Sequence, residues 1–364
     1  MSVMRLPSGV YHQTYAEDHA WWQTRFVWVR MIALFLILFV FIPIVMPALL
    51  PQYGLYVVSV SNLIGYTILS AMGVQLLIGY AGQLTLGHAA FIAVGGYTSA
   101  IAMLKFGMPY PLTILLAAIT AGLWSVLFGL PSARVKGYYL IMTTMAAQFI
   151  TVDFLITQYV SQIGGRGVAF SLPPGTVTIG PVEIDNDLKV YYLMLVLVIG
   201  CTLFVGNLLR TRVGRAWIAI RDNDIAAEVL GVNVIRYKLL AYFVGGALGG
   251  IAGAFWITSI YAVSPEHFAF SWSLWIVGVI LIGGVGSLYG TIYGSIFMVV
   301  IPELLRFAII PLQPIFPQLF SRFEFLKESV FGLSIILFLL YEPKGLAYRW
   351  WQIKNYIHLW PFSY

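Results

Sequence analysis

Long apolar runs, separated by short polar segments, dominate the hydrophobic pattern of the chain. A membrane-spanning helix needs roughly 20 predominantly apolar residues. The pattern predicts ten candidate spans at approximately residues 31–50, 55–78, 84–104, 111–130, 138–158, 190–209, 238–262, 272–289, 291–310 and 328–342. The third and eighth are rich in glycine and the last is short, so we expect eight to eleven spans, some of them broken or re-entrant.

The predicted fold is an all-α, polytopic membrane protein with a single transmembrane domain. An inverted repeat of two halves is one arrangement that fits this pattern. The expected segments are a cytoplasmic N-terminal segment (1–30), the transmembrane domain (31–342) with an external loop (159–189) and a cytoplasmic loop (210–237), and a cytoplasmic tail (343–364). Glycine, proline and alternating Val and Ile in the external loop predict turns and a short hairpin.

The distribution of lysine and arginine predicts the orientation, because short cytoplasmic loops are enriched in these residues. With both termini in the cytoplasm, most of the 20 basic residues fall inside. The inside set is Arg5, Arg25, Arg30, Arg134, Lys136, Arg210, Arg212, Arg215, Arg221, Arg236, Lys238, Lys344, Arg349 and Lys354. The outside set is Lys105, Arg166, Lys189, Arg306, Arg322 and Lys327.

Composition supports a lipid environment and excludes several classes of function. The chain is 60% hydrophobic and 9% charged, whereas a soluble domain has about 25% charged residues. Its net charge of +6 is scattered along loops, so we expect no nucleic-acid binding. The one cysteine, Cys201, excludes an internal disulfide and a cysteine-based metal cluster. Residues 1–28 lack the apolar core of a signal peptide, so we expect a multi-pass protein of the cell inner membrane whose N-terminus flanks the first span.

Two glycine-rich segments share the pattern Gly-x-x-Gly-x-Leu. One is "GYAGQLTLGHAAFIAVGG" at 79–96 and the other is "GGVGSLYGTIYG" at 283–294. Similar glycine-interrupted segments in the two halves of a transporter are typical of the translocation path, but glycines also let helices pack closely, and both interpretations stay open. The pathway candidates are Gly79, Gly82, Gln83, His88, Gly283 and Gly286. The four-residue spacings Gly245-Gly249-Gly253 and Gly286-Gly290-Gly294 favour packing.

A charged, helix-prone segment, Arg212 to Lys238, lies between two apolar runs. We predict a helix from about Ala216 to Leu230, with an apolar stripe of Ile218, Ile225 and Val229 and with Gly231 as its C-cap. Its acids Asp222, Asp224 and Glu228 suit it poorly to an anionic leaflet. The segment is therefore either docked on another protein, which could approach it closely at Ala226 and Ala227, or an ordinary solvated helix.

Ionisable residues inside spans are candidates for function. Asp153 lies near the outer end of its span, and Glu303 and Arg306 are three residues apart beside Pro302. These three residues are candidates for an outer vestibule, although a mutual ion pair of Glu303 and Arg306 would explain that pair equally well.

The chain lacks a phosphate-binding G-x-x-x-x-G-K-[ST] loop, an H-E-x-x-H motif and a cluster of metal ligands. The five histidines are far apart in sequence, and we expect His88 to be a hydrogen-bonding residue at a broken helix end. We therefore expect no catalytic residue, no metal site and no cofactor in this chain. A secondary transporter driven by an ion gradient is the main alternative, and the scarcity of ionisable residues near span centres argues against it. The sequence offers no paired acid and base or nucleophile constellation that would support an integral-membrane enzyme.

Several motifs, in order, resemble the LivM-type permease subunit of branched-chain amino acid ABC importers. They are "IGYAGQLTLGHAAFIAVGGYTSA" (78–100), "GYYLIMTTMA" (137–146), "GGRGV" (164–168), "GRAWIAIRDNDIAAEVLGVNVIRYKLLAY" (214–242), "IGGVGSLYGTIYGS" (282–295) and "PKGLAYRW" (343–350). The resemblance covers roughly residues 55–350. Aspartate at 222 and 224, where the family often has glutamate, and Arg166 in the external glycine loop depart from the family pattern.

The resemblance implies the partners and the mechanism. Residues 222–231 would form the coupling helix that docks into an ATPase, with the coupling residues Arg221, Asp222, Asp224, Ala226, Ala227, Glu228 and Gly231. A second, LivH-like permease subunit, two ATPase subunits that carry ATP and Mg, and a periplasmic solute-binding protein would complete the importer. The resemblance implies a branched-chain amino acid as solute, and relatives of this type also take amides, urea and aromatic acids.

Overall fold

The computed structural model describes residues 25–49, 53–133, 135, 137–160, 169–173, 175–312 and 322–359. The chain divides into two compact units, Met1–Ser59 and Val60–Tyr364, and the division falls within helix α4 (Gly54–Val74). The described part of the first unit contains α2 (Arg25–Leu36), the π-helix η1 (Ile37–Val45), α3 (Met46–Leu49) and the start of α4. Pro43 lies inside η1, where its missing N–H explains the departure from regular α-helical bonding.

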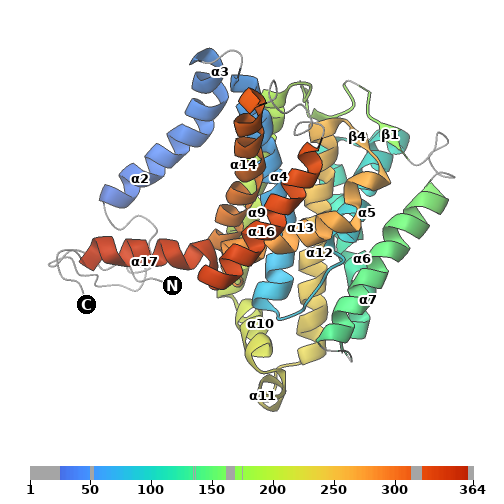
Figure 1. The fold of residues 1–364 in the computed structure, drawn as a ribbon. Helices are drawn as coiled ribbons and strands as arrows, with labels where there is room; N and C mark the ends of the chain where they lie inside the picture. The colour runs from blue at the N-terminus through green and yellow to red at the C-terminus, as the bar shows by residue number, and fades with distance from the viewer. Residues whose placement is uncertain are drawn as a thin grey trace. The chain divides into compact units, whose positions relative to one another are not determined.

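The second unit is a bundle of long helices (Figure 1). Its helical elements are the rest of α4, η2 (Gln75–Tyr80), α5 (His88–Phe106), α6 (Tyr110–Gly129), η3 (Leu130–Ala133), α7 (Tyr138–Phe149), η4 (Ile150–Val160), α9 (Asp187–Arg210), α10 (Arg212–Asp222), α11 (Asp224–Val229), α12 (Val234–Ile260), η5 (Pro265–Phe268), α13 (Phe270–Gly283), α14 (Leu288–Ile309), η6 (Ile310–Leu312), α16 (Phe323–Tyr341) and α17 (Gly345–Leu359).

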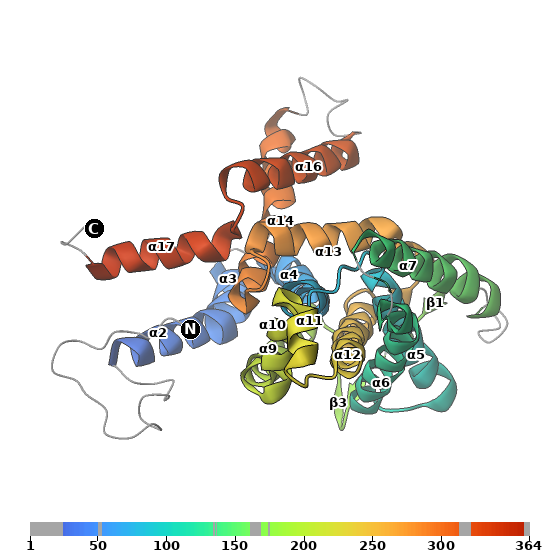
Figure 2. The same cartoon turned by 90° about the horizontal axis from the view of Figure 1, so that it is seen from below.

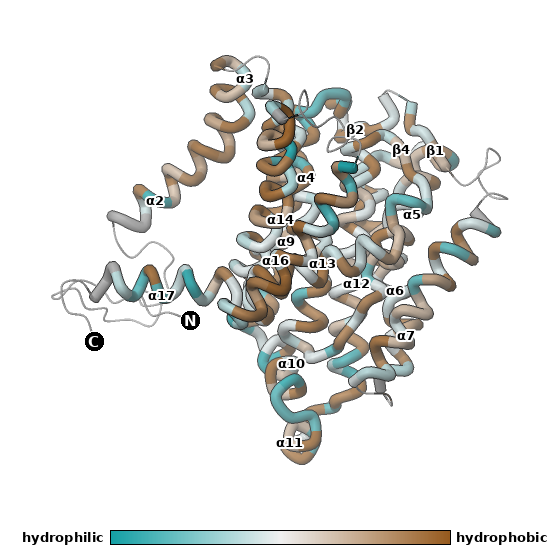
Figure 3. Tube along the Cα trace, in the orientation of Figure 1, coloured by the Kyte–Doolittle hydropathy of each residue, from teal (hydrophilic) through white to brown (hydrophobic). Residues whose placement is uncertain are grey.

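Nine helices among the described residues are long and apolar enough to cross a membrane. They are Trp28–Leu49, Gly54–Tyr80, His88–Phe106, Tyr110–Gly129, Tyr138–Gln158, Asp187–Arg210, Val234–Ile260, Pro265–Gly283 and Leu288–Ile309. The all-α polytopic fold is therefore confirmed, with a span number inside the predicted range. The expected last span, 328–342, is part of α16, whose first turns carry Glu324, Lys327 and Glu328. Figure 3 shows the hydrophobic character of the long helices.

Two span boundaries differ from the sequence prediction because glycine-rich turns interrupt the apolar runs. The third span begins at His88 rather than at residue 84, since residues 81–87 are irregular. The eighth ends at Gly283 rather than at residue 289, and a turn at 284–287 leads into α14. Hydropathy alone cannot locate these ends, because Leu84, Leu86 and Val285 keep both turns partly apolar.

Helix α12 forms the core of the second unit with α5 and α6 (Figure 2). Its glycines let the backbones approach closely, as their spacing predicts. A Cβ atom at Gly253 would lie 2.0 Å from the carbonyl oxygen of Ile92 in α5, and one at Gly250 would lie 2.4 Å from that of Ala117 in α6. Gly294 similarly packs on Val279 of α13. The predicted packing role of these glycine series is thus confirmed.

The end of the second unit where α9 begins carries short strands. β1 (Phe170–Ser171) pairs with β4 (Ala262–Val263), antiparallel, with Phe170 opposite Val263. β2 (Thr178–Ile179) and β3 (Val182–Glu183) form a hairpin, with Thr178 opposite Glu183. The hairpin predicted for the loop 159–189 is therefore confirmed. These strands lie at the opposite end of the bundle from α10 and α11 (Figure 1).

The contact between α12 and α5 yields a testable expectation for stability. Replacing Gly253 by alanine should force the two backbones apart and lower the free energy of unfolding by about 1–3 kcal/mol, the usual cost of overpacking. Thermal unfolding of the purified protein in detergent measures this change. Gly200→Ala on α9 is the matched control, since nothing lies within 4 Å of a Cβ there. Equal melting temperatures for the two variants would contradict the proposed role of Gly253.

Candidate functional site

Helix α10 connects the charged segment to the membrane helices. Thr211 caps its N-terminus by accepting a hydrogen bond from the N–H of Val213. Its apolar face buries Gly214, Ala216, Trp217 and Ile220. The indole of Trp217 donates to the carbonyl oxygen of Tyr237, 2.8 Å away, at the start of α12. This helix is therefore fixed to the bundle.

The single helix predicted from Ala216 to Leu230 is wrong, because the chain breaks at Asn223. The backbone of Asn223 is extended, with φ −160° and ψ 106°, and its side chain accepts from the N–H of Ala226, 3.0 Å away. An asparagine side chain competes with helix continuation and favours the N-cap position. Helix α11 thus starts anew at Asp224 and changes direction.

Helix α11 ends as the sequence predicts. Gly231 has a left-handed φ of +85° and donates to the carbonyl oxygen of Glu228, while Val232 donates to that of Ala227. This pair of hydrogen bonds is a Schellman cap, which needs a glycine or asparagine at the left-handed position.

Apolar side chains project from α11 and from the residue that follows it. Ile225 is 67% exposed, and Val229 and Leu230 are each 82% exposed. Of the two alanines expected to form a surface for close approach, Ala226 is exposed and Ala227 is buried. That prediction is therefore wrong for Ala227. The outward face of α11, with Leu230, therefore offers three large aliphatic side chains together with the acid Glu228.

The two glycine motifs, about 200 residues apart in sequence, pack against each other. A Cβ at Gly79 would lie 2.6 Å from the backbone nitrogen of Gly286, so only glycine fits. The Gln75 side chain donates to the carbonyl oxygens of Gly284 (3.1 Å) and Ser287 (2.9 Å). The hydroxyl of Tyr80 accepts from the N–H of Leu288, 3.1 Å away. The turns after η2 and after α13 thus form one compact junction.

Arg221, at the end of α10, joins this junction to the charged segment. Its Nη1 donates to the carbonyl oxygen of Gly79 at 2.7 Å, and its Nε and Nη2 both donate to Asp222. Gly82 and Gly286, with φ +67° and +80°, also lie against it, and a Cβ at either would come 3.1 Å from an arginine atom. Any displacement of α10 would therefore act directly on both glycine turns.

Two further pathway candidates, Gly283 and His88, make their close contacts with other helices. Gly283 packs on α14, where a Cβ would come 2.0 Å from the carbonyl oxygen of Gly290. His88 is buried and is the first residue of α5, as expected for a helix end. Its ring lies against Gly73 of α4 and Gly249 of α12. Neither ring nitrogen has a hydrogen-bond partner among the described residues, so the hydrogen-bonding role expected for His88 is not seen there.

Two polar side chains that the sequence prediction did not include accept hydrogen bonds from the first N–H groups of α5. The N–H of Ala90 donates to Gln148 Oε1 at 2.7 Å, and the N–H of Ala89 donates to Ser273 Oγ at 2.9 Å. The first N–H groups of a helix have no partner inside the helix, so these buried side chains replace the missing carbonyls. Their separation in sequence leaves no local signal that would reveal the contact.

A cavity of about 340 Å³ opens beside Arg221. Its walls are formed by Gly82, Gln83, Val135, Gly137, Leu140, Ile220, Arg221, Asp222, Asn223, Asp224 and Lys238. Lys238 is only 4% exposed, and its Nζ lies 3.6 Å from Asp224 Oδ2. Three predicted coupling residues and two predicted pathway residues therefore line a single cavity. Lys238, Val135 and Leu140 are additions that sequence reasoning missed.

The outer vestibule candidates lie on different elements. Asp153 is exposed on η4, which packs on α5 and η5. Glu303 and Arg306 are one turn apart on α14, which packs on α13 and α16. Their role in a vestibule stays a prediction. Arg166 lies outside the described residues.

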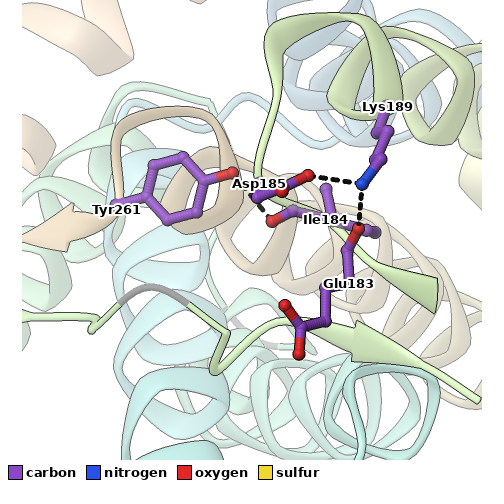
Figure 4. A network of polar contacts seen from close by, with 5 residues as sticks. All are labelled: Glu183, Ile184, Asp185, Lys189 and Tyr261. Atoms are coloured by element: carbon purple, nitrogen blue, oxygen red, sulfur yellow. Dashed lines mark hydrogen bonds and ion pairs between the residues drawn. The ribbon is translucent and has the colours of Figure 1, made fainter. Parts of the chain in front are cut away.

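A polar network anchors the hairpin loop to α9 and to the end of α12 (Figure 4). The ammonium of Lys189 donates to Asp185 and to the carbonyl oxygen of Glu183, and the hydroxyl of Tyr261 donates to the carbonyl oxygen of Ile184 at 2.9 Å. The hydrogen bond from Lys189 holds the pKa of the Asp185 carboxyl below its usual range. Burial, followed by the nearby charges of Asp185 and Asp187, raises the pKa of the Tyr261 hydroxyl.

Comparison with known proteins gives a consistent result. The family described as "Branched-chain amino acid transport system / permease component" matches residues 56–339. The chain is 28% identical to the high-affinity branched-chain amino acid transport system permease protein LivM of Salmonella typhimurium and 29% identical to that of Escherichia coli, in each case over 79% of this chain and 69% of the relative. It is 24% identical to LivH of Salmonella typhimurium over 77% of this chain and 91% of LivH. No solved structure gives a match.

The polar network at the hairpin predicts a pH dependence. The pKa of Asp185 is lower in the folded state than in the unfolded state. Its ionised carboxylate therefore stabilises the folded hairpin fully above the ordinary carboxyl pKa of about 3.9, and this stabilisation is lost as the pH falls through the lower pKa of the folded state. Lys189→Met removes the hydrogen bond that lowers the pKa, so amides 182–187 should be less protected than in the wild type at pH 6, and their protection should change less as the pH falls to 3. Hydrogen exchange followed across pH 6 to 3, with Lys105→Met as control, measures this difference. Identical profiles for wild type and Lys189→Met would refute the network.

Proposed function

Because the chain belongs to the family of branched-chain amino acid transport permeases and resembles its LivM-type members, we propose that it forms half of the translocation pathway of an ATP-driven importer. The match over residues 56–339 carries this proposal, since it covers nearly all the membrane helices of the second unit. The solute would be a branched-chain amino acid or a related small polar molecule. The relatives are transport-system permeases, which favours this function over a secondary transporter driven by an ion gradient.

The same comparison supports the partners that we propose. Similarity to both LivM and LivH supports a pair of related permeases, with a LivH-like subunit completing the pathway. Two ATPase subunits would bind ATP and Mg, and a periplasmic binding protein would deliver the solute. In this arrangement the permease chain moves the solute, and nucleotide chemistry takes place on other subunits.

The proposed orientation places α10 and α11 in the cytoplasm of a cell with an inner membrane. Helix α9 runs from the hairpin at its start to α10 at its end, so the two features lie at opposite ends of the bundle (Figure 1). The α10 end carries Arg210, Arg212, Arg215, Arg221, Arg236 and Lys238. Positive charge favours the cytoplasmic side, and both termini would lie there as well.

The face of α11 supports a docking role. Three exposed aliphatic side chains on a polar, water-facing end of a membrane protein need a partner surface, because no lipid covers them there. A short amphipathic helix inserted into an apolar groove is a recurrent form of recognition. We assign Ile225, Val229 and Leu230 to the contact with the ATPase, alongside Ala226 and Glu228, while Asp224 faces the cavity and pairs with Lys238.

Force would pass from α11 to the membrane through Arg221. Closure of the ATPases would displace α11 and α10 as the transporter switches between outward- and inward-facing states. Arg221 holds the carbonyl oxygen of Gly79 and contacts Gly286, so both glycine turns would follow α10. The turns begin α5 and α14, which would change their tilt.

Docking can be tested with a charged residue on α11. Val229→Asp should weaken co-purification with the ATPases roughly tenfold or more, because a buried valine contributes about 1.5–3 kcal/mol to an interface. ATP-dependent uptake should fall in parallel. The matched control is Val182→Asp, an exposed valine on the hairpin at the opposite end.

The isolated permease chain should not hydrolyse ATP. Hydrolysis by this chain alone, or undiminished co-purification of Val229→Asp, would argue against the assignment.

Transmission through Arg221 can be separated from docking. Arg221→Lys keeps the charge but loses the planar fork that holds Gly79 and Asp222 together. We expect normal co-purification of the ATPases and continued ATP hydrolysis, with solute uptake per ATP hydrolysed reduced about tenfold. Arg215→Lys, an exposed arginine on the same helix, is the control. Unchanged coupling in Arg221→Lys would show that motion reaches the bundle by another route.

A further inference from the structure

We propose that the 340 Å³ cavity beside Arg221 binds a zwitterionic amino acid with an aliphatic side chain from the cytoplasm, and that this binding slows the transporter. The inference rests on the proposed function, because it assumes that α10 and α11 face the cytoplasm and move during transport. It assigns Gly82 and Gln83, which the sequence predicts as pathway residues, to a cytoplasmic regulatory site instead.

The charges that line the cavity select a zwitterion. Two cations, Arg221 and Lys238, and two carboxylates, Asp222 and Asp224, lie on its walls. They are arranged as the pairs Arg221–Asp222, at 3.0 Å, and Lys238–Asp224, at 3.6 Å. A lone anion would meet two carboxylates and a lone cation two positive groups. A molecule with one charge of each sign can instead place its carboxylate beside the basic groups and its ammonium beside the acids.

Gln83 supplies a second, independent argument for a ligand. This side chain is 4% exposed, and its amide nitrogen donates to the carbonyl oxygen of Ala81. Its Oε1 atom is buried without a hydrogen-bond partner among the described residues. A buried acceptor without a donor is energetically unfavourable, so this atom is a reason to look for a bound donor at the cavity. Gln83 lines the cavity, so a rotation of its side-chain amide would let an ammonium group bound there, with three N–H donors, satisfy Oε1.

The rest of the wall is apolar and the volume is small. Val135, Leu140 and Ile220 line the cavity and give an aliphatic side chain a surface to bury. Pockets for small ligands range from about 300 to 1,000 Å³, so this cavity lies at the lower end. The size fits a single amino acid better than a nucleotide.

The position of the cavity explains how an occupant would act. Its walls come from the glycine turn at Gly82, from the start of α7, from the break at Asn223 and from the start of α12. A ligand that bridges these segments would hold α11 in its present position relative to the helices behind it. If ATPase closure moves α11, the ligand favours the resting state and closure weakens its binding by the same factor. Accumulated product would then restrain further import.

The experiment uses the complete importer in proteoliposomes with its ATPases facing outward and loaded binding protein inside. External L-leucine is the probe, and external ATP hydrolysis is the readout. We expect hydrolysis to fall at least about fivefold at saturating leucine, the lower end of allosteric effects. Leucinamide, N-acetyl-leucine and glycine should each inhibit much less, because each lacks the carboxylate, the ammonium or the aliphatic side chain.

Variants at Val135, which lies outside the coupling segment, test the cavity itself. Val135→Trp should fill the cavity and abolish inhibition while hydrolysis without external leucine persists, and Val135→Ala should remain inhibited. Gln83→Leu should weaken binding of radiolabelled L-leucine to the assembled complex without binding protein. Two results would overturn the proposal. One is inhibition of Val135→Trp equal to that of the wild type, and the other is no binding of L-leucine by the wild-type complex assembled without binding protein. If loaded binding protein fails to stimulate hydrolysis, the importer assignment fails, and the direct binding assay still decides the cavity.

Discussion

The organisation of the second unit depends on a backbone contact that only glycine permits. Gly79 and Gly286 meet at a distance at which a Cβ atom would collide with the opposite backbone, and both Gly82 and Gly286 adopt left-handed φ values. A left-handed φ costs a residue with a Cβ about 1 kcal/mol or more, and a blocked approach costs more still. This contact brings segments from the two halves of the chain to one point. Arg221 can reach both turns only because they already touch.

The same junction gives the charged segment two distinct faces. Trp217 and Ile220 of α10 are buried against the bundle, whereas Ile225, Val229 and Leu230 project away from it. The change of direction at Asn223 separates these faces, because a single straight helix would carry its apolar stripe along one side. One helix is thus fixed to the bundle and the next is presented outward, which is the geometry that a coupling element needs. The cavity lies at the bend between them, where a change in angle would alter its shape.

Much of this architecture could be predicted from the sequence, and the exceptions have physical causes. Length and hydropathy predict the helices, and glycine spacing predicts the close packing of α12, since both signals are local. The cap at Gly231 could also be predicted, because a glycine after a periodic apolar stretch has few other uses. The break at Asn223 could not, since asparagine also occurs inside helices and its capping bond depends on where the helix starts. The glycines that pack on the His88 ring and the residues that complete the cavity come from distant parts of the chain, and no local pattern relates Gln148 or Ser273 to the start of α5.

Exposed apolar side chains have different meanings on different parts of the molecule. Along the spanning helices, exposed residues such as Leu115, Leu123 and Val196 are the ordinary surface of a protein dissolved in lipid. The exposure of Val229 and Leu230 differs, because they follow two acids and precede a glycine cap at the water-facing end of the bundle. Water would penalise such a surface, and an anionic leaflet would repel the acids beside it. The proposed docking into a protein groove would resolve both conflicts at once, since a groove can bury the aliphatic side chains and pair the carboxylates with basic groups.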